Sequence, residues 1–301
     1  MFLDQNIRID KVDLSFYNIE TSVTLSVLRE DLIHPIISGN KFRKLKYNIL
    51  EAKKLKAKTI ITFGGAFSNH IAAVSYAGKI NNLETIGFIR GEELAEKINE
   101  NATLSFAKAN GMKFVFIDRE TYRNKDNKNY LQEISADYVD SYLIPEGGTN
   151  ELAIKGCQEI ITNQLKEFDV ICCSIGTGGT FIGLLKGKFA NQQLMGFPAL
   201  KNAFFLNQII QNYTSNVDYK LIHEYHFGGY AKITNELFNF VNLFNTKHNI
   251  YLDFIYTGKM AFGVIDLIKK NFFKSHSKIL MIHTGGIQGN SAILNKQIHQ
   301  K

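Results

Sequence analysis

Short apolar runs rich in β-branched and aromatic residues alternate along this chain with longer segments whose apolar residues recur every three or four positions. Runs of the first kind predict buried strands, and they cover residues 23–28, 59–63, 85–89, 113–117, 170–173 and 279–282. Segments of the second kind predict helices, and they cover residues 42–55, 70–79, 101–110, 151–166, 235–245 and 259–270. Strands that alternate with helices in this way indicate an α/β fold with largely parallel sheets.

The composition is that of an ordinary globular protein, with 45% of the 301 residues hydrophobic and 21% charged. A chain of this length accommodates one large or two modest domains. It contains no apolar run near the roughly 18 residues of a membrane-spanning helix, and its first residues do not resemble a signal peptide. We therefore expect a cytoplasmic location and no membrane partner.

The cysteines argue against a protein that is cross-linked by disulfides or binds a structural metal. There are three of them, two adjacent at Cys172 and Cys173, and no Cys-x-x-Cys spacing exists. So few cysteines cannot form a disulfide framework or an ordinary zinc site. We expect no metal.

The net charge of +7 admits either a nucleic acid or a small anionic ligand as a partner. Most lysines are scattered, but one cluster runs from Lys41 to Lys58 over a segment of helical periodicity. A solvent-facing helix surface and a nucleic-acid-binding surface both fit such a cluster. We favour the solvent-facing surface, because no nucleic-acid-binding motif accompanies the charge, and we expect no nucleic-acid partner.

Three of the predicted strands end in the same way, in a glycine-rich turn that leads into a helix. Residues 64–70 read Gly-Gly-Ala-Phe-Ser-Asn-His, residues 174–180 read Ser-Ile-Gly-Thr-Gly-Gly-Thr, and residues 283–286 read His-Thr-Gly-Gly. In open α/β sheets, ligands bind at the carboxyl ends of the strands, where such turns expose backbone N–H groups and hydroxyls. One turn of this kind is weak evidence, but three in one chain suggest a shared ligand-binding cleft.

The second of these turns suits a phosphate group, because it offers successive N–H donors at the start of a helix. It consists of Gly176, Thr177, Gly178, Gly179 and Thr180. It does not match the dinucleotide fingerprint, since Phe181 stands where the third glycine belongs, and it lacks the Lys-Ser/Thr ending of a nucleotide P-loop. A tight packing turn and a site for the single phosphate of a small cofactor both stay open, and we favour the cofactor.

A second element, Ser38-Gly39-Asn40-Lys41, stands at the start of a predicted helix. A lysine there lies near the positive end of the helix dipole, which disfavours its ammonium form and makes the neutral amine more accessible. Such an amine can form a Schiff base with a carbonyl cofactor. An ordinary surface lysine also fits Lys41 taken alone. Together with a turn for one phosphate, however, Lys41 points to pyridoxal 5′-phosphate.

The motifs, taken in order, resemble those of the D-cysteine desulfhydrase and 1-aminocyclopropane-1-carboxylate deaminase family. That family belongs to the fold-type II pyridoxal phosphate enzymes related to the tryptophan synthase β subunit. The matching motifs are Arg-Glu-Asp-Leu at 29–32, Ser-Gly-Asn-Lys-x-Arg-Lys at 38–44, Gly-Gly-x-x-Ser-Asn-His at 64–70, Gly-Gly-Thr-Asn at 147–150, Gly-Thr-Gly-Gly-Thr at 176–180, Tyr-Thr-Gly-Lys at 256–259 and His-Thr-Gly-Gly at 283–286. Any one motif is weak evidence, but their order along the chain is strong evidence.

The resemblance implies a two-domain α/β enzyme, each domain an open, mostly parallel sheet flanked by helices. The larger domain, residues 1–47 and 150–301, would bind the cofactor phosphate. A smaller inserted domain, residues 48–149, would carry the substrate-binding serine. The resemblance also implies a homodimer that acts on a small amino acid.

Roles for individual residues follow from the same resemblance. Lys41 would hold the cofactor, the turn from Gly176 to Thr180 would bind its phosphate, and Asn69 would hydrogen-bond its 3′-oxygen. Ser68, Asn69 and His70 would contact the substrate, and Tyr256 and Tyr230 would be active-site tyrosines. Without the resemblance, Ser68 fits a helix cap and the tyrosines fit half-buried core residues. Phe67 and Ala231 depart from the family pattern and bear on the choice of substrate.

Thr257 bears on which reaction the chain catalyses. In deaminase-like members a glutamate at this position faces the pyridine nitrogen of the cofactor and keeps it protonated, whereas threonine would supply a hydrogen bond without a charge. The resemblance therefore implies β-elimination, in which D-cysteine yields pyruvate, ammonia and sulfide. Opening of 1-aminocyclopropane-1-carboxylate and dehydration of D-serine are alternatives within the family, and a binding or regulatory protein of the same fold is an alternative outside it.

Overall fold

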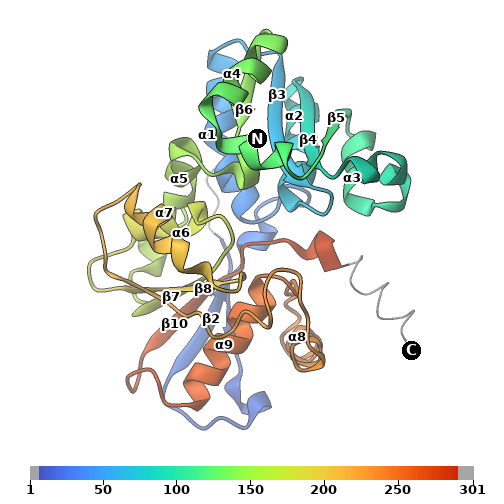
Figure 1. The fold of residues 1–301 in the computed structure, drawn as a ribbon. Coiled ribbons are helices and arrows are strands. Elements are labelled where there is room, and N and C mark those ends of the chain that lie inside the picture. The colour runs from blue at the N-terminus through green and yellow to red at the C-terminus, as the bar shows by residue number, and fades with distance from the viewer. Residues whose placement is uncertain (1–6, 291–301) are drawn as a thin grey trace. The chain divides into compact units, whose positions relative to one another are not determined.

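The structure is a computed structural model in which residues 7–290 are described (Figure 1). Of these, residues 7–34, 38–40 and 157–290 form one compact unit, called here the large unit. Residues 35–37 and 41–156 form a second, the small unit. The boundaries of the small unit thus lie at residues 41 and 156, whereas the sequence predicts them at 48 and 149.

The difference arises because α1 (Asn40–Lys54) and α5 (Glu151–Gln158) pack closely together. The side-chain amides of Asn48 and Asn150 form a reciprocal pair of hydrogen bonds, 2.7 and 3.2 Å long. A side chain at Gly156 would overlap the carbonyl of Arg43, so the two helices meet at backbone distance. Most of both helices therefore belongs to the small unit.

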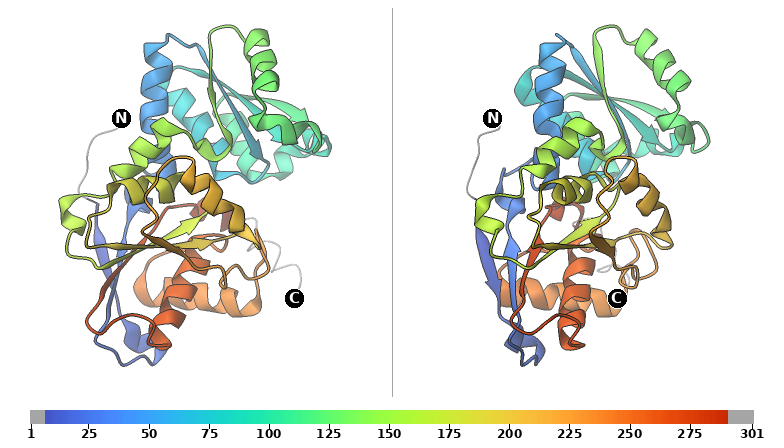
Figure 2. Two further views of the ribbon diagram at one scale, coloured as in Figure 1. Left: turned by 60° about the vertical axis from the view of Figure 1, so that its left-hand side comes forward. Right: turned by 90° about the vertical axis from the view of Figure 1, so that its left-hand side faces the viewer.

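The large unit is built on a sheet that, among the described residues, has six strands in the order β1-β2-β10-β7-β8-β9. β1 runs antiparallel to β2, and the other neighbours are parallel. Helices flank this sheet (Figure 2). The elements are β1 (Ile9–Val12), β2 (Thr24–Leu28), β7 (Val170–Ile175), β8 (Gln193–Pro198), β9 (Tyr219–Leu221), β10 (Lys278–Ile282), α6 (Gly179–Gly187), α7 (Leu206–Gln211), α8 (Asn235–His248) and α9 (Thr257–Lys269).

The small unit has a parallel sheet with the strand order β5-β4-β3-β6 in its described part. Its strands are β3 (Thr59–Gly65), β4 (Glu84–Arg90), β5 (Met112–Ile117) and β6 (Ser141–Ile144), and its helices, besides α1 and α5, are α2 (Asn69–Asn81), α3 (Ala102–Ala109) and α4 (Lys128–Asp137). Helix α2 packs on β3, β4 and α3. Apolar side chains of β3 and β4 form a core with Tyr122 and Ile134. The predicted fold class, an α/β fold with two mostly parallel sheets flanked by helices, is confirmed.

The lysine cluster on α1 is not purely a solvent-facing surface. Arg43 and Lys44 are buried. The ammonium of Lys44 donates hydrogen bonds to the carbonyl of Gly147, at 2.8 Å, and to the hydroxyl of Thr149, at 3.2 Å. The interpretation of the cluster as a solvated helix face is therefore wrong for these two residues, because the turn after β6 takes up the charge of Lys44.

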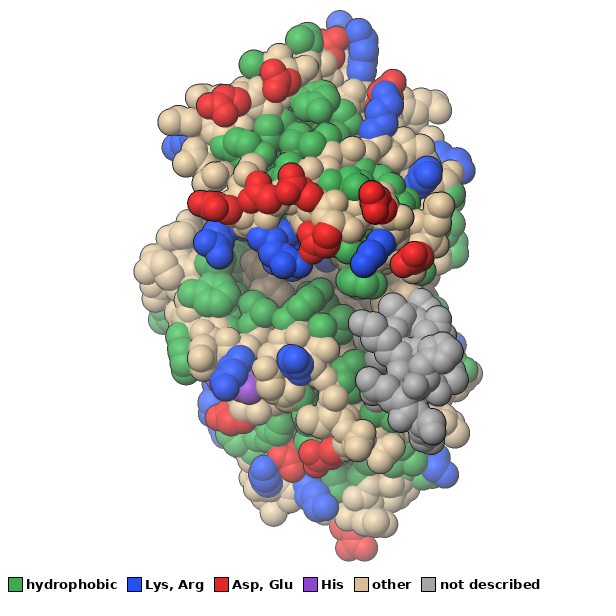
Figure 3. All heavy atoms as spheres, turned by 45° about the vertical axis from the view of Figure 1, so that its right-hand side comes forward, with side chains coloured by type: hydrophobic (Ala, Val, Ile, Leu, Met, Phe, Trp, Pro, Cys, Tyr) green, Lys and Arg blue, Asp and Glu red, His purple; other side chains and the backbone are tan. Residues whose placement is uncertain are grey.

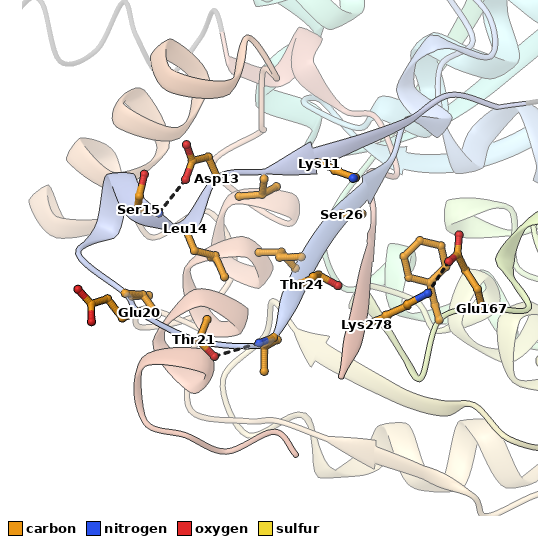
Figure 4. A pocket seen from close by; sticks show the side chains of 15 residues that line it. Lys11, Asp13, Leu14, Ser15, Glu20, Thr21, Thr24, Ser26, Glu167 and Lys278 are labelled. Atoms are coloured by element: carbon orange, nitrogen blue, oxygen red, sulfur yellow. Dashed lines mark hydrogen bonds and ion pairs between the residues drawn. The ribbon is translucent and has the colours of Figure 1, made fainter. Parts of the chain in front are cut away.

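A surface groove of about 660 Å³ lies beside β1 and β2 of the large unit (Figure 4). Its lining includes Thr24 and Lys278, the first residues of β2 and β10, and Glu167, which precedes β7. These residues mark the amino ends of the strands, whereas the glycine-rich turns follow the carboxyl ends. Because ligands of open α/β sheets bind at the carboxyl ends, this groove is not the candidate site.

On the face drawn in Figure 3, Lys and Arg side chains are interspersed with Asp and Glu. Within residues 7–290, every helix is too short or too polar to span a bilayer. The same residues contain no cluster of side chains arranged to hold a metal ion, and the three cysteines are buried and free.

Candidate active site

The turn after β7 presents backbone donors at the start of α6. Gly178 directly precedes this helix with φ = 89°, a value that favours glycine, and no side chain caps the helix. The first N–H groups of a helix lack partners within it and, together with the helix dipole, attract an anion. The start of α6 thus has no side-chain cap where the sequence predicts the cofactor phosphate, and phosphate binding by this turn stays a prediction.

Asn40 ties the chain just before Lys41 to two glycine-rich turns. Its side-chain amide donates to the hydroxyl of Thr180, at 2.9 Å, and its backbone N–H donates to the carbonyl of Thr284, at 3.1 Å. Lys41 is the next residue and the second of α1. The backbone that leads into Lys41 is therefore fixed by the turns after β7 and β10.

The Arg-Glu-Asp-Leu motif supports the same segment from the end of β2. The guanidinium of Arg29 donates two hydrogen bonds to Asp31, at 2.9 and 2.7 Å, and a third to Asp10, at 2.8 Å. The carbonyl of Glu30 accepts a hydrogen bond from the N–H of Gly39, at 3.0 Å. This motif therefore holds the backbone that leads to Lys41.

Gly39 should not tolerate alanine. Its φ is 61°, and a Cβ there would overlap the carbonyl of Thr284. Gly111 is the matched control, since its φ is 88° but nothing lies within 4 Å of an added Cβ. In urea unfolding we expect Gly39→Ala to lose about 2–4 kcal/mol and Gly111→Ala about 1–2 kcal/mol. Equal losses would show that backbone strain alone, and not the overlap, sets the cost.

Both predicted tyrosines lie near the glycine-rich turn after β7 in the large unit. A Cβ on Gly176 would lie 3.1 Å from the ring of Tyr256 and 3.3 Å from its hydroxyl oxygen. The ring of Tyr230 packs edge-on against that of Tyr256, with the centroids 6.1 Å apart. Tyr230 is 45% exposed, so it is not a core residue. That the two tyrosines take part in the reaction stays a prediction.

The hydroxyl of Thr257 is hydrogen-bonded to Asp253 both as donor and as acceptor. It donates to the carboxylate of Asp253, at 2.7 Å, and accepts from the N–H of Asp253, at 2.9 Å, and Thr257 is fully buried. Its proton is thus directed to Asp253 in this structure, and its predicted hydrogen bond to the pyridine nitrogen stays a prediction. That carboxylate also accepts three backbone N–H bonds, from Ile255, Tyr256 and Thr257. Thr257 and Asp253 together fix the turn that carries Tyr256.

Removing this hydroxyl should cost stability. Thr257→Val keeps the shape of the side chain. It leaves the N–H of Asp253 without an acceptor and removes one of the four hydrogen bonds to the carboxylate of Asp253. We expect it to lower the free energy of unfolding by about 1–3 kcal/mol in urea denaturation. Thr257→Ser, which keeps the hydroxyl, should lose less. A valine variant as stable as the wild type would show that Asp253 does not depend on this bond.

In the small unit, Ser68 and Asn69 begin α2 after the turn that follows β3. The hydroxyl of Ser68 accepts a hydrogen bond from the N–H of His70, at 3.2 Å, so the helix-cap interpretation is confirmed. Ser68 and Asn69 are both partly exposed. Their predicted contacts with substrate and cofactor stay predictions.

His70 is 1% exposed and lies beneath this turn. The hydroxyl of Thr62 donates to the carbonyl of Ile144, at 2.8 Å, so it accepts from Nε2 of His70, also at 2.8 Å. The other ring nitrogen, Nδ1, is buried without a hydrogen-bond partner. Burial, with the charges of Lys41 and Lys44, holds the pKa of His70 well below its usual value. The imidazole is therefore neutral at pH 7, and its predicted contact with substrate stays a prediction.

A small cofactor with one phosphate and an aldehyde fits this chemistry, since the turn after β7 supplies uncapped donors and Lys41 supplies an amine next to an anchored Asn40. Residues 11–285 match the family described as pyridoxal-phosphate dependent enzymes. The chain belongs to this family.

Relatives of this pyridoxal-phosphate dependent enzyme narrow the family further. It is 31% identical over 293 residues to a candidate 1-aminocyclopropane-1-carboxylate deaminase of Pyrococcus horikoshii, with 90% of this chain and 86% of the relative covered. It is 30% identical over 291 residues to the mitochondrial bifunctional D-cysteine desulfhydrase/1-aminocyclopropane-1-carboxylate deaminase of Arabidopsis thaliana, with 88% and 73% covered. A crystal structure of a 1-aminocyclopropane-1-carboxylate deaminase homologue matches with a TM-score of 0.84 at 27% identity, covering 98% of this chain and 94% of that one. The predicted family, fold type and cofactor are confirmed.

The sequence did not reveal the structural roles of two residues close to Thr257 in the pyridoxal-phosphate dependent enzyme. Asp253 closes the turn before α9, and an acidic residue just ahead of a predicted helix is a signal that could have found it. Lys259 lies within the Tyr-Thr-Gly-Lys motif, but only the structure shows that its ammonium is buried.

Proposed function

We propose that this enzyme catalyses β-elimination from a small D-amino acid, with D-cysteine as the substrate that fits best, and releases pyruvate, ammonia and sulfide. The supporting observation is that the start of α9 offers no available carboxylate. The first turn of α9 has no acidic residue, and Asp253 already accepts four hydrogen bonds. The deaminase-like pattern has glutamate in place of Thr257.

The charge at this position bears on the reaction. A carboxylate next to the pyridine nitrogen favours its protonated form, which makes the cofactor a stronger electron sink. Elimination needs less stabilisation of the negative charge that develops at Cα, because a thiolate is a good leaving group and departs from Cβ as the Cα proton is lost. Opening a cyclopropane ring breaks a carbon–carbon bond and needs more of it. A first turn without a carboxylate therefore favours elimination.

The residues would divide the work as follows. Pyridoxal phosphate, when bound, makes the Cα–H bond of an amino acid acidic. The amine of Lys41 would take the Cα proton, and the turn from Gly176 to Thr180 would hold the phosphate. N–H groups at the start of α2, with Ser68, would bind the substrate carboxylate. One D-cysteine and one water then give one pyruvate, one ammonia and one hydrogen sulfide.

Opening of 1-aminocyclopropane-1-carboxylate is the second candidate, and the names of both relatives support it. The two reactions give different keto acids, pyruvate with three carbons and 2-oxobutanoate with four. The product therefore identifies the reaction without any assumption about the site.

The test is a comparison of substrates with the purified enzyme and saturating cofactor. D-cysteine, L-cysteine, D-serine and 1-aminocyclopropane-1-carboxylate are supplied in turn, and keto acid is assayed. We expect kcat/KM for D-cysteine to exceed that for the cyclopropane by at least about tenfold. A faster ring opening would overturn the proposal. No keto acid from any of the four would favour a binding or regulatory protein.

A further inference from the structure

Lys259 is a buried lysine to which the proposed reaction gives no role. It lies in the first turns of α9 and is 2% exposed. Its ammonium donates to the carbonyl of His226, at 2.9 Å, and to the carbonyl of Gly229, at 2.7 Å. Lysine is almost never fully buried unless its charge has partners, and here both partners are backbone carbonyls of one loop.

The loop that Lys259 holds has an unusual backbone. Phe227, Gly228, Gly229 and Ala231 have φ values of 52°, 90°, 118° and 56°. Residues other than glycine adopt positive φ at an energetic cost, and such conformations persist only where their surroundings hold them. Loop 226–231 therefore depends on side chains that fasten it.

Helix α9 supplies these side chains from one of its faces. Besides the two bonds of Lys259, the ring of Phe262 packs edge-on against Phe227, with the centroids 4.9 Å apart. Asp266 accepts a hydrogen bond from the hydroxyl of Tyr225, at 2.7 Å. Positions 259, 262 and 266 are three and four residues apart and so share a helix face. Phe262 and Asp266 hold the start of the loop, and Lys259 reaches further along it.

The second group that Lys259 contacts is the peptide bond just before Tyr230. The carbonyl of Gly229, which accepts from Lys259, belongs to the peptide bond that joins Gly229 to Tyr230. Burial does not fix the Tyr230 ring, which is half-exposed, yet it stands edge-on against Tyr256 beside the phosphate-binding turn. The peptide before Tyr230 sets the direction in which its side chain leaves the backbone.

We propose that Lys259 is the positioning residue for Tyr230: by fixing the Gly229–Tyr230 peptide, its ammonium holds the Tyr230 ring against Tyr256. That Lys259 fixes the loop does not depend on which reaction the enzyme catalyses. Its consequence for catalysis rests on the proposed function.

The charged groups around Lys259 are consistent with an ammonium at pH 7. Burial lowers the pKa of Lys259 to about 8, against an opposing effect of Asp253. On the loop side, Nδ1 of His226 accepts from the N–H of Gly228. Two more lysines, Lys201 and Lys232, lie close to the loop backbone. A Cβ added at Gly229 would lie 3.5 Å from the Cβ of Lys201, and one added at Gly228 would lie 3.5 Å from the Cβ of Lys232. At pH 7 Lys259 thus has three donors for two carbonyls.

The first test follows the motion of the loop. The chain contains no tryptophan, so Tyr230→Trp introduces a single fluorophore. Time-resolved fluorescence anisotropy of the full chain at pH 7 is compared in three backgrounds: Lys259, Lys259→Met and Lys269→Met. Lys269 is the matched control, because it lies exposed at the end of the same helix. We expect the amplitude of fast local motion at position 230 to rise about twofold or more in Lys259→Met only.

The second test connects the loop to the reaction. Lys259→Met and Tyr230→Phe are combined in a double-mutant cycle on kcat/KM for D-cysteine. Lys259→Met should lower kcat/KM about 10- to 100-fold in the wild type, but less than about threefold when Tyr230 is already phenylalanine. A residue needed only for folding would lower both to the same extent.

The outcomes separate this proposal from the proposed function. Unchanged anisotropy in Lys259→Met, or additive effects in the cycle, would overturn the positioning role. A wild type inactive on D-cysteine would overturn the proposed function, while the anisotropy would still decide whether Lys259 holds the loop. If Lys259→Met does not fold, the same anisotropy measurement on Lys259→Gln decides, since its shorter amide cannot reach both carbonyls.

Discussion

Lys41→Ala is expected to abolish keto-acid formation from every substrate that the wild type accepts. The amine of Lys41 is assigned both the covalent hold on the cofactor and the removal of the Cα proton. Loss of a group with two such functions should lower kcat by at least about 10³-fold. The measurement is kcat at saturating pyridoxal phosphate. The position of Lys41 supports this size of effect, because the residue before it is hydrogen-bonded to Thr180 and Thr284.

Lys54→Ala is the matched control on the same helix. The side chain of Lys54 is 75% exposed and makes only a 3.5 Å ion pair with Glu51 among the contacts described for it. Its replacement should change kcat by no more than about twofold, as for most surface substitutions. If Lys41→Ala keeps activity within tenfold of the wild type while Lys54→Ala behaves likewise, another group performs the chemistry.

Gly178→Asp is expected to weaken the binding of pyridoxal phosphate by on the order of 10²-fold or more. Gly178 directly precedes α6 with φ = 89°, so a side chain there strains the backbone. The added carboxylate also repels a phosphate dianion held by the N–H groups of the same turn. Equilibrium titration of the cofactor-free protein measures the dissociation constant directly.

Gly178→Asn separates the effect of the added charge on cofactor binding from the effect of the added side-chain volume. Asparagine has the size of aspartate, tolerates positive φ and carries no charge. A Cβ at Gly178 would make only ordinary contacts, 3.6 Å from Ile209 and 3.7 Å from Ile182. We expect about tenfold weaker binding or less for this variant. Undiminished binding by Gly178→Asp would place the phosphate elsewhere, and equal losses in both variants would show that charge plays no part.

The pattern of the sequence was sufficient to predict the strands β2, β3, β4, β5, β7 and β10 and the helices α1, α2, α3, α5, α8 and α9. It missed β8, because Gly196 and Pro198 interrupt the apolar run. The reason for Gly196 is tertiary, since a side chain there would overlap those of Ile175 and Phe181. It also missed β1, an antiparallel strand in which charged Asp10 and Lys11 separate Ile9 from Val12. The helix predicted over 151–166 ends at Gln158, ahead of residues 160–162, where three β-branched residues follow one another.

Motifs located the glycine-rich turns because backbone geometry demands specific residue types there. They did not reveal which polar groups satisfy one another. Thr257 carries the residue type expected of a cofactor contact, but Asp253 takes its proton. Lys259 and Lys44 look like surface lysines in the sequence, yet each holds a turn through backbone carbonyls. Such pairings depend on packing between segments far apart in the chain.

The proposed chemistry depends above all on Lys41 being the lysine that holds the cofactor. The purified enzyme is saturated with pyridoxal phosphate, treated with borohydride to make any lysine link permanent, and digested for mass spectrometry. We expect to find the cofactor on the peptide containing Lys41, and to find none at that position in Lys41→Ala. Recovery of the cofactor on Lys44, Lys46 or Lys259, with Lys41 unmodified, would contradict this expectation.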